Sequence, residues 1–246
     1  MKRKRTKIAV VVAVVILLLI VGSALMNGGK NEPQETEEPQ EEMITSGELP
    51  EPDAPSTTGE VSYPCKLEGT DLVIESMNSY DGAFLEDGSN REVSGVTAIV
   101  LKNTGDSYIE YASIHLEAET PLNFKATALE PGAEMMVIES AATPFSPQEY
   151  EYAAADAAET EPFDLSADKL KIEEQENGTL KVTNISSEDI ASARVFYKLY
   201  RAEDDIYTGG ITYTANFENL KAGASAEGAP AHYVPHETKI MMAKIY

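Results

Sequence analysis

Residues 178–184 read GTLKVTN and residues 97–103 read TAIVLKN, so the two stretches end on Asn184 and Asn103. Short runs rich in Val, Ile, Thr and Leu, bounded by turn residues, are typical of β-strands. The match continues without a gap into a second run: Ile109, Ala112, Ile114 and Leu116 fall over Ile190, Ala193, Val195 and Tyr197. An internal repeat therefore organises the chain beyond residue 60.

The repeat extends in both directions from these strands. An insertion in the second copy interrupts the spacing, which resumes where residues 129–133 (LEPGA) fall over residues 220–224 (LKAGA). Upstream, residues 71–76 (DLVIES) fall over residues 169–174 (KLKIEE). The second copy ends in residues 239–246 (KIMMAKIY), which predict a closing strand.

This succession of short strands predicts a mainly β fold. We expect two tandem, small, immunoglobulin-like antiparallel β-sandwiches, at residues 61–160 and residues 161–246. Helical composition after residue 60 is confined to residues 152–160 (YAAADAAET). Their alanines favour either a short helix or a connector between the two domains.

Period-2 alternation predicts which side chains face each core. In the first copy Ala112, Ile114, Leu116 and Ala118 face inward, and Ser113, His115, Glu117 and Glu119 face water. In the second copy Ala193, Val195, Tyr197 and Leu199 point one way, and Arg194, Phe196, Lys198 and Tyr200 point the other. Phe196 and Tyr200 thus form an aromatic pair on the outer face. They either pack beneath the inserted residues 203–215 or form an exposed surface for a partner.

The charge balance excludes one class of partner. The chain has 19 Lys and Arg against 42 Asp and Glu, a net charge of -23. Five of the 19 lie within residues 2–7, before the first acid, Glu32, so 14 basic residues face 42 acidic ones beyond the apolar stretch. Such a surface repels nucleic acid, and we expect no DNA or RNA partner.

The N-terminus predicts membrane attachment. Residues 8–26 (IAVVVAVVILLLIVGSALM) carry no charge, and as a helix they would span roughly 28 Å, close to the hydrocarbon thickness of a bilayer. The basic residues 1–7 would stay in the cytoplasm and the remainder would lie outside, as a single-pass protein of the cell membrane. The alternative is a signal peptide cleaved after Ala24, which would release the chain. Both interpretations export the remainder of the chain.

Residues 27–60 predict a disordered linker. They combine five prolines with glutamate, glutamine, serine and threonine, and they have no basic residue after Lys30. Such a segment buries too little apolar area to offset its ordering entropy. Charge repulsion and proline stiffness favour an extended stalk.

A family resemblance rests on the second copy. Residues 197–201 (YKLYR) follow a Val-Thr-Asn strand end and precede a Leu-x-x-Gly turn. This arrangement resembles the FxLYD family, small β-sandwich modules of bacterial envelope proteins, with its best match over residues 178–224. Tyr197 stands where the family has Phe and Arg201 where it has Asp, and the first copy has only LEAET at residues 116–120. The resemblance implies a sandwich, an exported setting and a bacterial source, with a Gram-positive one favoured. It implies no catalytic residues.

Candidate chemistry is sparse, and we expect neither an enzyme nor a metal or cofactor site. His115 lies at an outward strand position, while His232 and His236 flank Pro235 and give two ligands where zinc needs three or four. The Gly-x-Ser-x-Gly elbow is absent, and Gly209-Gly210 lacks the lysine and the helix of a phosphate loop.

Two features stay open at this level. Residues 80–92 (YDGAFLEDGSNRE) are either a polar hairpin loop with turns at Asp81-Gly82 and Asp87-Gly88, or a calcium loop using Asp81, Asp87, Asn90 and Glu92. Cys65 is the sole cysteine and is either inert or forms a disulfide between chains.

These patterns predict a non-enzymatic, membrane-anchored extracellular protein. We expect a binding or scaffolding module of a bacterial envelope, with Phe196 and Tyr200 as its candidate contact residues. Its partners would be the lipid bilayer, through residues 8–26, and an envelope protein or cell-wall polymer. The alternative is an exported hydrolase that uses a carboxylate pair which sequence alone does not identify.

Overall fold

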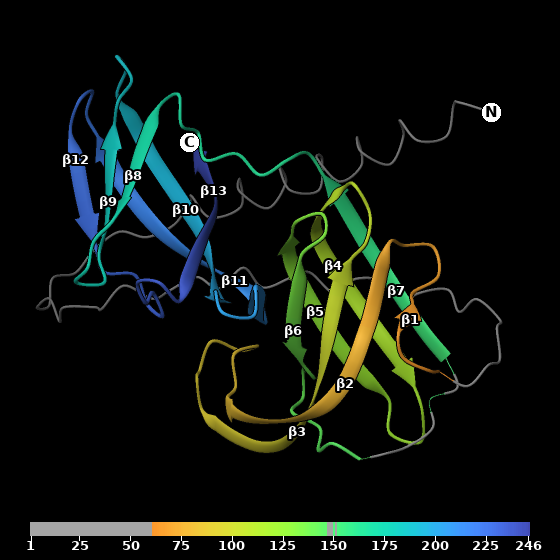
Figure 1. Cartoon of the computed structure of the whole chain (residues 1–246). Coiled ribbons are helices and arrows are strands. Elements are labelled where there is room, and N and C mark those ends of the chain that lie inside the picture. The colour runs from red at the N-terminus through yellow and green to blue at the C-terminus, as the bar shows by residue number, and fades with distance from the viewer. Residues whose placement is uncertain (1–60, 147–149, 151) are drawn as a thin grey trace, which may run out of the picture. The chain divides into compact units, whose positions relative to one another are not determined.

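The computed structural model describes residues 61–146, 150 and 152–246 (Figure 1). The predicted cytoplasmic tail (1–7), membrane helix (8–26) and linker (27–60) lie outside these described residues. Within them, no helix has the length and apolarity needed to cross a membrane. Every regular element of the described part is a β-strand, which confirms the prediction of a mainly β fold.

Thirteen strands make up the described part of the chain. They are β1 (Cys65–Lys66), β2 (Leu72–Ala83), β3 (Glu92–Asn103), β4 (Tyr108–Glu117), β5 (Leu122–Leu129), β6 (Glu134–Ile138), β7 (Tyr152–Thr160), β8 (Leu170–Glu174), β9 (Leu180–Asn184), β10 (Ile190–Arg201), β11 (Ile206–Leu220), β12 (Ser225–Gly228) and β13 (Thr238–Ile245).

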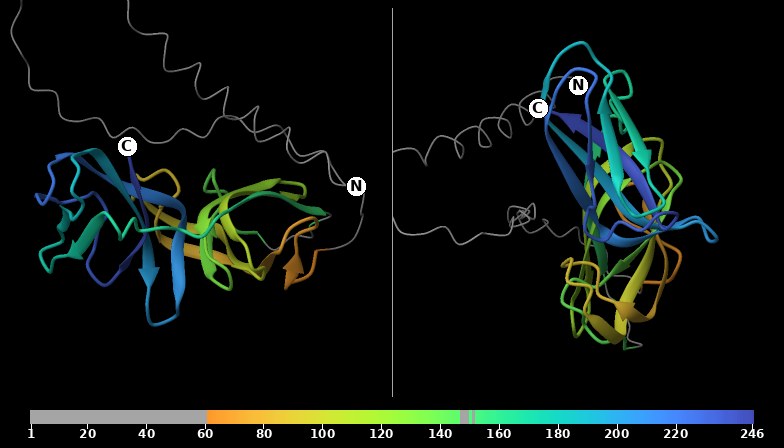
Figure 2. Two further views of the ribbon diagram at one scale, coloured as in Figure 1. Left: turned by 90° about the horizontal axis from the view of Figure 1, so that it is seen from above. Right: turned by 90° about the vertical axis from the view of Figure 1, so that its left-hand side faces the viewer.

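The sheet topology repeats within the chain, as the sequence correspondence predicts. We call residues 61–160 the first half and residues 161–246 the second half. In the first half β3 lies between β2 and β6, and β4 lies between β5 and β7. In the second half β9 lies between β8 and β12, and β10 lies between β11 and β13. In each half these two groups of strands lie in separate layers (Figure 2).

The two halves share one sheet. Its order is β1-β2-β3-β6-β11-β10-β13 within the described residues, and all of its pairs are antiparallel except that β11 runs parallel to β6. The parallel contact joins Ile206, Tyr207 and Thr208 to Glu134, Met135 and Met136. Those β11 residues belong to the inserted segment, so the insertion is what joins the halves. The division into two separate domains at residue 160 stays a prediction.

The two asparagines that the repeat aligns, Asn103 and Asn184, make equivalent contacts. Asn103 Nδ2 donates to the carbonyl oxygens of Ser107 (2.8 Å) and Leu129 (3.4 Å). Asn184 Nδ2 donates to those of Glu188 (2.7 Å) and Leu220 (2.9 Å). Both asparagines are fully buried.

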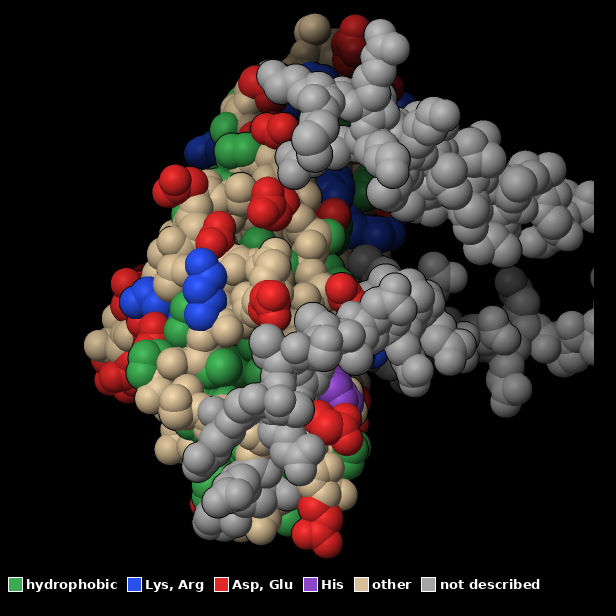
Figure 3. Space-filling view, turned by 90° about the vertical axis from the view of Figure 1, so that its right-hand side faces the viewer, with side chains coloured by type: hydrophobic (Ala, Val, Ile, Leu, Met, Phe, Trp, Pro, Cys, Tyr) green, Lys and Arg blue, Asp and Glu red, His purple; other side chains and the backbone are tan. Residues whose placement is uncertain are grey.

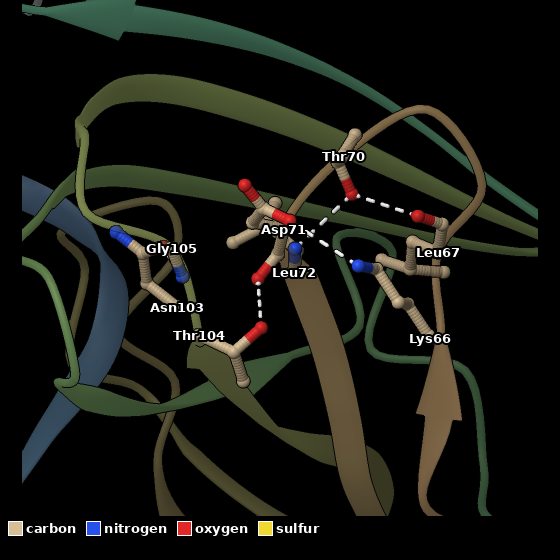
Figure 4. Close-up of polar contacts among 8 residues, drawn as sticks. All are labelled: Lys66, Leu67, Thr70, Asp71, Leu72, Asn103, Thr104 and Gly105. Atoms are coloured by element: carbon tan, nitrogen blue, oxygen red, sulfur yellow. Dashed lines mark hydrogen bonds and ion pairs between the residues drawn. The ribbon is translucent and has the colours of Figure 1, made fainter.

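Each asparagine also orders the turn that follows it. Gly105 N donates to Asn103 Oδ1 (3.1 Å), and Ser186 N donates to Asn184 Oδ1 (2.9 Å). Figure 4 shows the turn of the first half, where Thr104 donates to the carbonyl oxygen of Asp71 at the start of β2. One buried amide in each half therefore ties the end of one strand to the turn that follows it and to the end of a second strand.

Two apolar cores lie in the described part, and the core of the first half also takes in Tyr207 and Met241 from the second half. In the first half the fully buried residues include Leu72, Ile99, Ile114 and Phe124. The core of the second half is built from the inward residues of β9, β10 and β11, among them Val182, Val195 and Phe217. The inward positions predicted by alternation at Ala112, Ile114, Leu116, Ala193, Val195 and Tyr197 are buried.

Three expectations from the sequence are wrong. Residues 152–160 form strand β7, neither a helix nor a connector, because pairing with β4 and burial of Ala154 override the helix preference of alanine. Asp81-Gly82 lies within β2 at a bulge and makes no turn, since β2 continues to Ala83. Lys198, at a position predicted to face outward, is fully buried because the first half covers that face of β10.

Candidate functional site

An open groove in the second half is a candidate site. It lies between β8 and β13, which are the outer strands of two different sheets. Its volume is about 470 Å³, and its walls include Leu165, Ile172, Thr238 and Ile240. A second hollow of about 610 Å³ adjoins it and shares Tyr200, Ala202 and His236 with it.

The floor and walls of the groove are mainly apolar. Leu165 stands 42% exposed at its side, although a leucine is usually buried. Two of its charged groups are already engaged: Glu174 accepts a hydrogen bond from the Tyr233 hydroxyl, and Lys239 Nζ lies 2.7 Å from Glu130 Oε2. Such a surface offers apolar contact area to a ligand.

The two predicted contact residues lie in different surroundings. Tyr200 lies beside the groove, where its ring packs 5.4 Å from that of Tyr207 and its hydroxyl donates to Asp205 Oδ1 (2.5 Å). Phe196 is only 8% exposed, with Lys244 Nζ 5.6 Å from its ring centroid. Tyr207 belongs to the insertion, so the insertion covers Tyr200 in part. A partner surface at Phe196 and Tyr200 stays a prediction.

The histidines lie apart and have other contacts. His115 contacts Asn123 Oδ1 (2.8 Å) and Glu117 Oε2 (3.0 Å). His232 Nδ1 lies 2.7 Å from Asn90 Nδ2, and His236 lines the groove. Among the described residues, no group of three or more His, Cys, Asp or Glu is arranged to hold a metal ion.

The candidate calcium ligands of residues 80–92 also contact different neighbours. Asp81 Oδ1 accepts hydrogen bonds from Ser94 Oγ (2.5 Å) and Gly95 N (2.9 Å). These bonds hold the pKa of the Asp81 carboxyl below its ordinary value. Asp87 lies 3.8 Å from Arg91, and Asn90 contacts His232. The loop is thus tied to its own hairpin and to the second half.

Cys65 lies on β1, at the edge of the large sheet, and packs partly against the core of the first half. Burial raises the pKa of the Cys65 thiol, which lowers its reactive thiolate fraction. Whether it pairs with another chain stays a prediction.

The most unusual buried group is the Lys198 ammonium. Nζ donates to three backbone carbonyl oxygens: Ile211 (2.7 Å), Thr127 (2.9 Å) and Gly210 (3.0 Å). Thr127 belongs to β5 of the first half, whereas Gly210 and Ile211 belong to β11. An ammonium has three donors and here each has an acceptor, so Lys198 joins the two halves as a fully satisfied structural group.

The backbone of β11 bulges to make this contact. Tyr197 pairs with Tyr213 and Leu199 pairs with Thr208, so residues 209–212 lie opposite Lys198 alone. A Cβ atom on Gly210 would lie 1.8 Å from the carbonyl oxygen of Lys125 in β5. Only glycine allows β11 to approach β5 this closely.

The carboxylate of Glu86 lies close to Lys198 and Gly210. Glu86 Oε1 accepts hydrogen bonds from Ile138 N (2.9 Å) and Gly210 N (3.0 Å). Burial raises the pKa of the Glu86 carboxyl to about 7, while these bonds and Lys198 act in the opposite direction. Burial also lowers the pKa of Lys198, and the nearby Glu86 opposes that shift. The buried carboxylate of Glu139 is similarly bound by the backbone N–H groups of Asn123, Ala141 and Thr143.

Glu86 should make stability depend on pH between about 4.5 and 7. Below pH 4.5 both the folded and unfolded states hold the proton, and between 4.5 and 7 only the folded state does. The free energy of unfolding should therefore fall as pH rises through this window, by about 3 kcal/mol from this group. In Glu86→Gln this part of the fall should be missing. Urea titrations at several pH values check it, and parallel profiles for the two proteins would contradict it.

Sequence reasoning missed Lys198 and Glu86 as partners. Lys198 sits in an alternating run whose outward face usually meets water, and Glu86 lies in a loop rich in acids. The paired glycines Gly209-Gly210, considered above only as a phosphate loop, were the available signal of a close backbone approach.

No family model matches the chain, and neither a curated protein nor a solved structure shows significant similarity to it.

Proposed function

We propose that this protein is a non-enzymatic binding or scaffolding module of a bacterial cell envelope, anchored by its N-terminal segment. One observation carries the proposal. The buried side chains of Lys198 and Glu139, and the partly buried side chain of Glu86, are engaged by backbone groups, while an open, largely apolar groove lies between β8 and β13. That combination suits a rigid body that presents a contact surface.

The sequence supports the location. Residues 8–26 form an uncharged run of bilayer length, preceded by five basic residues and followed by a strongly acidic region. Acidic side chains are spread over the described face drawn in Figure 3. The repeated sheet order supports two immunoglobulin-like sandwiches, and the YKLYR signature supports a relationship to the FxLYD family.

The anchoring is tested with the full chain carrying a C-terminal tag. We expect the tag to sediment with membranes after a high-salt wash, to be released by detergent, and to be digested by protease added to intact cells. A shortened chain in the medium, beginning after Ala24, would overturn the anchor. Tag protection in intact cells would overturn the extracellular placement.

The binding role needs its own test. The full chain in zwitterionic nanodiscs serves as bait for envelope extracts, with empty nanodiscs as the control. Recovery of a specific envelope protein or cell-wall polymer supports the proposal. Turnover of a carbohydrate or peptide panel without any recovered partner would favour an exported hydrolase instead.

A further inference from the structure

The two halves differ at one equivalent edge. In the first half, β1 pairs antiparallel with β2, matching Cys65 to Ile74 and Lys66 to Val73. The sequence repeat places Ile172 of β8 over Ile74 of β2. Strand β8 pairs with β9 and ends its sheet, so no described strand lies where β1 would be.

The register identifies the backbone groups on that edge. Ile185 N donates to Lys169 O (2.8 Å), and Gln175 N donates to Thr179 O (2.9 Å), so the odd-numbered residues of β8 bond to β9. The N–H and C=O groups of Ile172 and Glu174 consequently point away from β9. Within the described part of the chain, no hydrogen bond reaches them. Both residues line the groove.

Leu165 lacks the packing that its counterpart Leu67 has in the first half. In the first half Leu67 follows β1, donates its N–H to Leu72 O (2.9 Å) and is 0% exposed. The same spacing places Leu165 over Leu67, yet Leu165 is 42% exposed beside the groove. The core position that β1 and Leu67 fill in the first half is thus a groove in the second.

The chain just before β8 is engaged elsewhere. Phe163 packs edge-on against Tyr108, with ring centroids 4.8 Å apart. Ala243 N donates to Asp164 O (2.8 Å), and Ser166 Oγ donates to Ala243 O (3.0 Å). This segment therefore follows β13 and leaves the β8 edge open.

We propose that an extended segment of a partner protein adds to the outer edge of β8 and places alternate apolar side chains in the groove. Strand β1 and the residues just before it show the chemistry of such an occupant, because Val61, Tyr63 and Cys65 all pack against the core of the first half. Strand addition draws affinity from main-chain hydrogen bonds and specificity from alternate side chains.

The charges around the groove indicate which polar residues alternate with the apolar residues of that segment. Lys239 is paired with Glu130, and Arg201 with Asp204, at the groove and the adjoining hollow. Glu203 and Glu237 line the same hollow, and no described cation forms an ion pair with either of them. Because these acids lie in the hollow that adjoins the groove, the segment should carry lysine or arginine between its apolar residues. This inference rests on the proposed binding role and names the partner class.

The test uses the full chain in zwitterionic nanodiscs and a fluorescent, end-capped heptapeptide of alternating lysine and valine. Fluorescence anisotropy should show saturable binding to loaded discs and none to empty ones. The same peptide with methylated backbone nitrogens at alternate positions should bind about tenfold more weakly or worse, because it cannot complete the ladder. Equal binding of the two peptides would overturn the proposal.

Two matched variants at Ile172 differ in whether the outward backbone N–H is kept. Ile172→Pro removes the outward N–H and keeps the β8–β9 bonds, whereas Ile172→Ala trims the side chain and keeps that N–H. We expect about a tenfold or greater loss of peptide affinity for the proline variant and a smaller loss for alanine. Leu165→Lys, at an exposed position, should also weaken binding. Circular dichroism confirms that each variant is folded, and unchanged affinity in folded Ile172→Pro and Leu165→Lys would overturn the site.

Two further outcomes separate the alternatives. Sedimentation of the unliganded chain that shows a dimer abolished by Ile172→Pro would assign the edge to a second copy and overturn the partner segment. If envelope extracts yield a partner equally well with wild type and Ile172→Pro, the edge inference fails and the proposed function stands. If the peptide binds as expected but extracts yield no partner, the envelope role fails and the edge remains a peptide site.

Discussion

Lys198→Ala should lower the free energy of unfolding by about 3–5 kcal/mol, the largest loss we expect from a single side-chain truncation in this protein. The change leaves the carbonyl oxygens of Thr127, Gly210 and Ile211 without their lysine donor, and it leaves the Glu86 carboxylate without a nearby cation. Urea denaturation followed by circular dichroism measures the loss.

Two controls separate hydrogen bonding from packing. Lys198→Met keeps most of the side-chain volume but supplies no donor, so it should recover only part of the loss. Lys171→Ala removes an exposed lysine paired with Glu173 on β8, and it should change stability by no more than about 0.5 kcal/mol. Full recovery in Lys198→Met would show that volume, and not the three hydrogen bonds, determines the effect.

Asn184→Ala and Asn103→Ala should each lower the free energy of unfolding by about 2–3 kcal/mol. Each removes a buried amide that donates to two carbonyl oxygens and accepts a backbone N–H, in equivalent places of the two halves. Similar losses in the two variants would follow from the shared geometry. Asn78→Ala, on an exposed part of β2, is the matched control and should stay within about 0.5 kcal/mol of wild type.

The same pair of variants reports on the connection between the halves. If the shared sheet and Lys198 make one cooperative unit, each variant should move a single transition detected by both circular dichroism and tyrosine fluorescence. Two separate transitions, with each variant moving only one of them, would show that the halves unfold independently.

The repeat predicted a large part of the fold because it aligned residues with the same local requirements. The strands around Asn103 and Asn184, the Leu-x-x-Gly turns and the closing strand all lie where the alignment places them. Inward positions such as Val195 also follow from alternation, since a half-buried strand has a period of two.

The features of the fold that the sequence did not predict depend on contacts between segments that are distant in the chain. Local pattern places Lys198 on the solvent side of β10, and only the approach of β5 from the first half buries it. Residues 152–160 have a helical composition, yet β4 offers them a complete strand partner. The groove arises from the absence of a strand over β8 among the described residues, and a sequence pattern does not register a missing neighbour. Leu165 was the clue, because it corresponds to the buried Leu67.

The parallel contact between β6 and β11 also constrains the order in which this chain can mature. Residues 134–136 are synthesised some 70 residues before their partners at 206–208, so the first half emerges with one edge of its principal sheet unpaired. An unpaired edge is a template for pairing with another chain until its own partner arrives. The acidic excess of the chain, which makes neighbouring copies repel one another, would protect that nascent edge during the interval.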